Sequence, residues 1–152
     1  MITLHAYMEQ VRALQVPADN PELEDLEGLC VRPDNDGIME YFRARKERLN
    51  RGMWPVVAMP WVRELAGWLE GRSVLEVMAG GGWIAAGLAR CGVDVLATDD
   101  CSWDKRHALM VRMHPTAKAT ALAAVRQHRD DREVLLVSWP YMNEDAAEAC
   151  AG

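Results

Sequence analysis

The spacing of apolar residues changes near residue 72 and divides the chain into two parts. Before that point, apolar residues recur every three or four positions, as on amphipathic helices. This spacing predicts helices over Thr3–Leu14 and Ile38–Asn50, and a third that Pro60 opens. Prolines and the turn-rich segment Pro33–Gly37 separate them. We therefore expect residues 1–72 to form an N-terminal helical cap.

From residue 73 onward, short apolar runs alternate with helical patterns. The runs predict strands at Val74–Met78, Val93–Ala97 and Val134–Val137, with a short or irregular strand between Met113 and Thr120. The intervening helices are expected over Gly82–Cys91, Ser102–Met113, Ala119–His128 and Asn143–Cys150. Because nearly all-apolar strands between helices occur in parallel sheets covered on both faces, residues 73–152 predict an α/β, Rossmann-like three-layer αβα core.

Composition narrows the function classes. The formal net charge is −6, which disfavours nucleic acid as a partner because phosphate contacts need clustered Lys and Arg. We find no signal peptide and no apolar stretch of about 20 residues, so no membrane is expected. The four cysteines show no zinc-type spacing and the histidines are scattered. We therefore expect a reduced, cytoplasmic protein with no metal site.

One helix has a basic side that needs an explanation. Its basic residues are Arg43, Lys46, Arg48 and the nearby Arg51. They could contact an acidic ligand, but Glu40 and Glu47 dilute the charge. A solvated helix face is the favoured interpretation.

A glycine-rich turn, Ala79-Gly80-Gly81-Gly82, joins the first strand to its helix. Glycine lets the main chain turn sharply and lets a ligand approach it closely. Asp99 follows at the end of the second strand, where an acidic side chain can accept hydrogen bonds from ribose hydroxyls. Together these features predict a site for a nucleoside-bearing cofactor. The alternative is a turn whose glycines serve only helix–strand packing.

The turn alone does not identify the cofactor. Gly80-x-Gly82-x-x-Ala85 also fits the dinucleotide pattern. Glu76, however, stands on the strand just before the turn. A carboxylate there would repel a pyrophosphate but could accept hydrogen bonds from an amino-acid ammonium group. A dehydrogenase is therefore disfavoured.

The segment Val74–Asp99 resembles the first two motifs of class I S-adenosylmethionine-dependent methyltransferases, and Leu135–Tyr141 is similar to their fourth. The resemblance implies S-adenosylmethionine as cofactor and the strand order 3-2-1-4 of an incomplete methyltransferase sheet. Met78 stands where the first glycine is usual, and Thr120 replaces an adenine-binding Asp. The implied cofactor-binding residues are Glu76, Ala79, Gly80, Gly82, Asp99, Asp100 and Thr120.

The segment Ser138-Trp139-Pro140-Tyr141 is similar to the Asp/Asn/Ser-Pro-Pro-aromatic turn of the amino-methylating branch of that family, with Trp139 in place of one proline. The resemblance implies that Ser138 accepts a hydrogen bond from the substrate amine and that Tyr141 or Trp139 stacks on the substrate. Ser138, Pro140 and Tyr141 are thus the candidate catalytic residues. The alternative is a strand end plugged by aromatic side chains.

Two functions fit these observations. One is a methyltransferase acting on an amino group of an unidentified substrate, and the other is a non-catalytic relative that binds a protein or a nucleoside. The chain ends soon after the fourth strand, so we expect that strand to leave an open edge. A second copy or another protein is expected to cover the edge. The N-terminal helices are the alternative cover.

Overall fold

The computed structural model describes residues 1–21, 35–102, 110–140 and 144–151. Four strands and the helices of this part alternate after residue 73, as expected. In chain order the elements are α1 (Leu4–Arg12), α3 (Asn35–Asn50), α4 (Met59–Leu69), β1 (Val74–Val77), α5 (Trp83–Arg90), β2 (Val95–Asp99), β3 (Thr116–Lys118), α6 (Ala121–His128), β4 (Val134–Val137) and α7 (Glu144–Ala151).

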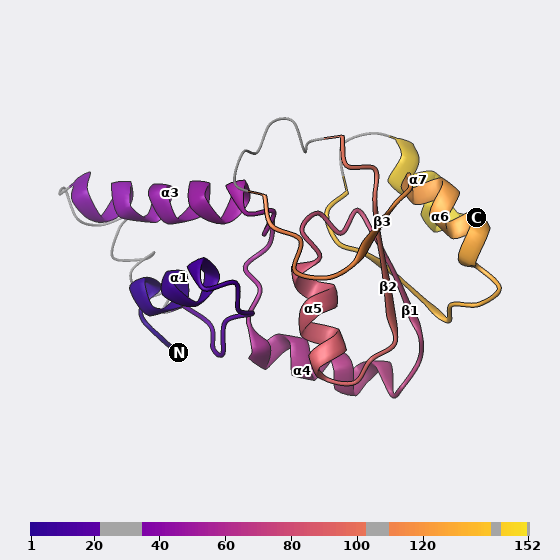
Figure 1. Ribbon diagram of the computed structural model, residues 1–152, viewed down its shortest axis with the longest axis horizontal. Coiled ribbons are helices and arrows are strands. Elements are labelled where there is room, and N and C mark those ends of the chain that lie inside the picture. The colour runs from indigo at the N-terminus through magenta and orange to yellow at the C-terminus, as the bar shows by residue number, and fades with distance from the viewer. Residues whose placement is uncertain (22–34, 103–109, 141–143, 152) are drawn as a thin grey trace.

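The four strands form one parallel sheet in the order β3-β2-β1-β4. Helices α4 and α5 lie on one side of this sheet, and α6 and α7 lie on the other (Figure 1). Side chains of β1 alternate between the two sides: Val74 packs in the core beneath α4 and α5, whereas Leu75 and Val77 pack beneath α6. The predicted three-layer α/β architecture and strand order are confirmed.

The N-terminal helices share a hydrophobic core with the sheet. Tyr7 of α1 and Trp83 of α5 belong to the same buried cluster. The Tyr7 hydroxyl donates a hydrogen bond to the Val57 carbonyl at 2.8 Å, and burial raises the pKa of Tyr7 to about 12. Trp83 Nε1 donates to the carbonyl of Arg51 at 3.0 Å. The described part of residues 1–72 is therefore packed into the fold, and α1 and α3 lie outward from α4 and α5 (Figure 1).

Two expectations from the sequence need correction. The predicted helix Ser102–Met113 is wrong at its C-terminal end, because residues 110–113 are not helical. There, the Met113 N–H donates to the carbonyl of Gly81 at 2.8 Å. Ser102, the predicted first residue, lies in a turn, and residues 103–109 of that helix lie outside the described residues. The solvated-face interpretation is wrong for Arg48, which is 7% exposed and whose pKa is lowered by burial.

The described residues contain neither a membrane-spanning helix nor a cluster of metal ligands. None of their helices is long and apolar enough to cross a membrane. None of their His, Cys, Asp and Glu side chains gather in a group of three or more that could hold a metal ion.

Candidate functional site

The glycine turn lies at the carboxyl end of β1, beside the carboxyl end of β2. Gly80 has a φ of +59°, in the left-handed region that glycine enters without penalty. Met78, at the position where the methyltransferase motif has its first glycine, has a φ of +56°. A side chain in this region costs roughly 1–2 kcal/mol. The backbone thus keeps the conformation that glycine favours although methionine occupies the position.

Asp99 ties the turn to the end of β2. Its carboxylate accepts a hydrogen bond from the Gly80 N–H at 2.8 Å on Oδ2 and from the Cys101 N–H at 2.7 Å on Oδ1. The side chain is buried. Asp100, the next residue, is exposed and accepts from the Ser102 N–H at 2.8 Å. Of the two predicted acids, Asp99 is the one that contacts the glycine turn.

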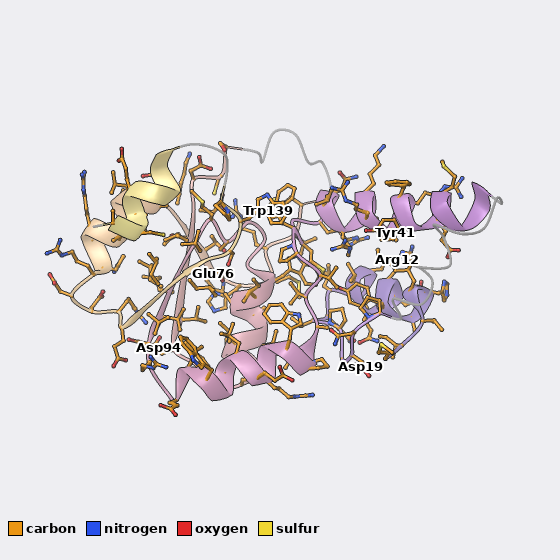
Figure 2. The ribbon with its side chains drawn as sticks, turned by 180° about the vertical axis from the view of Figure 1, so that it is seen from behind. Arg12, Asp19, Tyr41, Glu76, Asp94 and Trp139 are labelled. Atoms are coloured by element: carbon orange, nitrogen blue, oxygen red, sulfur yellow. The ribbon has the colours of Figure 1, made fainter. Side chains whose placement is uncertain are left out.

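Glu76 and Ser138 form a buried pair between β1 and the end of β4. The Ser138 hydroxyl donates to Glu76 Oε1, and Glu76 lies in the interior (Figure 2) with no exposed surface. Glu76 Oε2 has no hydrogen-bond partner within the described part of the chain. The pKa of Glu76 is raised to about 7, and burial is the main cause. The hydrogen bonds from Ser138 and the Ala85 N–H lower the pKa, and the charge of Asp99 adds to the rise.

The chain itself occupies the space against the three glycines of the turn. A Cβ atom on Gly80 would lie 2.4 Å from Trp54 Nε1, and one on Gly81 would lie 2.6 Å from the Val111 carbonyl oxygen. A Cβ atom on Gly82 would lie 3.0 Å from the Cβ atom of His114. The absence of side chains in the turn therefore lets two distant segments of the chain approach it closely, the connection between α3 and α4 and the segment before β3.

Trp54 comes from the connection between α3 and α4 and was not among the predicted site residues. Its ring stacks on Trp139, with ring centroids 6.1 Å apart and planes 23° from parallel. Figure 2 labels Trp139, which directly follows Ser138. No local periodicity marks Trp54; an aromatic residue between Gly52 and Pro55 was its only signal in the sequence.

The remaining predicted site residues differ in their surroundings. Ala79 is buried within the turn, and its N–H donates to the Thr98 carbonyl at 3.0 Å. Thr120 caps α6 by accepting from the Ala123 N–H at 3.3 Å, and its side chain is exposed. Pro140 is exposed, and Tyr141 lies outside the described residues. The structure therefore brings together Glu76, Gly80, Asp99 and Ser138.

Comparison with known proteins gives one short similarity. A stretch of 41 residues, 27% of this chain, is 46% identical to a ubiquinone biosynthesis O-methyltransferase from Bordetella avium (strain 197N). The match spans only 17% of that protein's length. No family model matches the chain, and no solved structure matches it. The similarity indicates a relationship to a methyltransferase over that stretch.

Proposed function

We propose that this chain is an S-adenosylmethionine-binding, methyltransferase-like protein. The observation that carries the proposal is the glycine turn after β1, closed by Asp99 from β2 in a parallel sheet of order 3-2-1-4. Carboxyl ends of neighbouring parallel strands are the usual place for a nucleotide-like ligand in such sheets. The short stretch shared with an O-methyltransferase supports the same class.

Two acidic residues beside the glycine turn, on β1 and β2, fit this cofactor. Asp99 lies at the carboxyl end of β2 and is bonded to the turn through Gly80, and an acidic side chain at this position is the usual acceptor for ribose hydroxyls. Glu76 Oε2 is a buried acceptor with no partner among the described residues, which an amino-acid ammonium group would satisfy. The cofactor, when bound, supplies a methyl group activated by its attachment to a sulfonium.

Ser138 is the proposed contact for the methyl acceptor. Because its one proton is donated to Glu76 Oε1, the lone pairs of Ser138 Oγ remain as acceptors. These lone pairs can accept a hydrogen bond from the N–H of a substrate amino group. Such a contact aligns the amine with the methyl donor, and alignment of the two reactants is the main catalytic requirement. We therefore propose an amino group as the acceptor.

The second candidate is a non-catalytic nucleoside-binding or protein-binding module. It is favoured by Trp54, which occupies the space next to Gly80. It is also favoured by Met78, whose side chain stands at a position with a left-handed backbone. Either side chain would crowd the end of the site that receives the methionine part of a cofactor.

Calorimetry with S-adenosylmethionine and S-adenosylhomocysteine tests the proposal. We expect binding at micromolar concentrations and about ten- to hundredfold weaker binding by Asp99→Ala, since charge-assisted hydrogen bonds contribute roughly 1.5–3 kcal/mol. Asp130→Ala, which removes a carboxylate that is 96% exposed after α6, is the matched control and should bind like the parent. Thermal melting checks that each variant is folded. An absence of heat at millimolar ligand with the parent protein would refute the proposal.

A further inference from the structure

The backbone that carries Trp54 is anchored on both sides. The Gly52 carbonyl accepts from the Gly81 N–H at 3.1 Å, and the Arg51 carbonyl accepts from Trp83 Nε1 at 3.0 Å. Met53 is fully buried, and Pro55 restricts the backbone of the residue before it to extended conformations. This segment is therefore held against the glycine turn.

The indole of Trp54 lies between the glycine turn and a second tryptophan ring. The residue is only partly buried, and its ring stacks on Trp139, which is itself 41% exposed. Trp54 Nε1 and Cδ1 would lie 2.4 and 2.6 Å from a Cβ atom on Gly80. These distances leave no room for a ligand atom between the ring and the main chain of Gly80.

From this geometry we infer that Trp54 is an aromatic gate over the glycine turn, closed by stacking on Trp139, and that a ligand reaches Gly80 only after the indole rotates away. The inference rests on the proposed function, because it concerns the same cofactor site. The gate moves by rotation of the Trp54 side chain, because the hydrogen bonds of Gly52 and Arg51 fix the backbone that carries the ring.

A gate of this kind has a defined effect on binding. Only the fraction of molecules with the indole turned away can bind, so the apparent dissociation constant is the intrinsic constant divided by that fraction. Removing the indole raises the association rate and leaves the dissociation rate nearly unchanged. If Trp54 instead formed a wall that contacts the bound ligand, removing it would raise the dissociation rate and weaken binding.

The experiment compares the parent chain with Trp54→Ala and with Trp139→Leu, which removes the Trp139 ring from the stack but keeps Trp54. Trp68→Ala is the matched control, because Trp68 is 61% exposed on α4 and its ring faces Arg72. S-adenosylhomocysteine is the probe, with calorimetry for affinity and stopped-flow mixing for rates. We expect both gate variants to bind about three- to tenfold more tightly, through faster association, as expected for loss of one aromatic stack.

The outcomes separate the gate from the proposed function. If the parent binds and both gate variants bind equally or more weakly, the gate is refuted while the proposed function stands. If no variant binds at millimolar probe, the proposed function is wrong and the gate falls with it. Should Trp54→Ala fail to fold in a thermal melt, Trp139→Leu decides the question by the same criterion.

Discussion

At the scale of single residues, Glu76 is a carboxyl group in an environment that disfavours its charge. It has no exposed surface, and its hydrogen bonds do not offset burial, so its pKa is raised to about 7. Ser138 donates to it. The protonation state of Glu76 therefore changes near neutral pH, where the other carboxyl groups of an ordinary protein are ionised.

This raised pKa makes the stability of the chain depend on pH in a particular direction. The folded state holds the Glu76 proton more tightly than the unfolded chain, whose pKa is near 4.5. The free energy of unfolding should fall as pH rises from about 4.5 to 7, by up to about 3 kcal/mol, and then level off. Urea unfolding of the parent and of Glu76→Gln across this range measures it. The variant should lack this fall, and identical pH slopes for the two proteins would contradict the prediction.

At the scale of elements, the glycine turn is the point at which two distant segments of the chain meet the sheet. The turn contacts the connection between α3 and α4, and also the segment that precedes β3. Gly81 lies closest to a backbone atom, because a Cβ atom there would be 2.6 Å from the Val111 carbonyl oxygen. Two backbones must separate to admit a methyl group at this position.

Replacing glycine with alanine at two positions distinguishes a glycine needed for close contact with another segment from one that only lowers the stability of its helix. Gly81→Ala should reduce the free energy of unfolding by about 1–3 kcal/mol, as overpacking does. Gly67 lies within α4, and a Cβ atom on it would meet no other segment of the chain within 4 Å. Gly67→Ala should therefore stabilise the protein by about 0.5–1 kcal/mol. Denaturant unfolding measures both changes. If Gly81→Ala is neutral, the segment before β3 is not packed against the turn as described.

The strands were predictable because their signals are local, whereas their order followed from the resemblance to a methyltransferase sheet. The Val134–Val137 run coincides with β4, and the run ending at Met78 gives β1 with one residue too many. The second run was predicted two residues too early, because β2 ends at Asp99 rather than Ala97. Apolar runs mark the buried part of a strand, while pairing with a neighbour decides where the strand ends.

The site was only partly predictable, for a related reason. Glu76, Gly80, Asp99 and Ser138 follow from the ends of strands, and strand order places those ends together. The contact of Trp54 with Gly80 joins residues with no shared periodicity. The burial of Arg48 likewise depends on α3 packing against α1, which a helical wheel does not contain. Tertiary packing decided both.

At the scale of the whole molecule, the sheet has an edge at β4. Among the described strands, β4 pairs with β1 alone, and Leu135 on it is 36% exposed. An edge of apolar residues offers unpaired backbone groups to another chain. The N-terminal helices lie on the α5 side of the sheet (Figure 1). A second copy or a protein partner at this edge remains our prediction.

Light scattering at low micromolar concentration tests the edge. We expect a mass above the 17.0 kDa of one chain, and a lower mass for Leu135→Lys, which places a charge on the exposed edge strand without emptying the core. Amide exchange of residues 134–137 is the second readout. A parent protein of 17.0 kDa with slow exchange over these residues would show that nothing further is needed to protect the edge.

During synthesis, the core that α1 shares with the sheet cannot form until later segments of the chain have been made. Tyr7 is covered by Met53 and Val57, and that connection is in turn held by Trp83 through the Arg51 carbonyl. A ribosome releases α1 before the segments that bury it, which follow tens of residues later. The first helix must therefore wait, with its apolar face uncovered, until the strand and helix around the glycine turn have emerged.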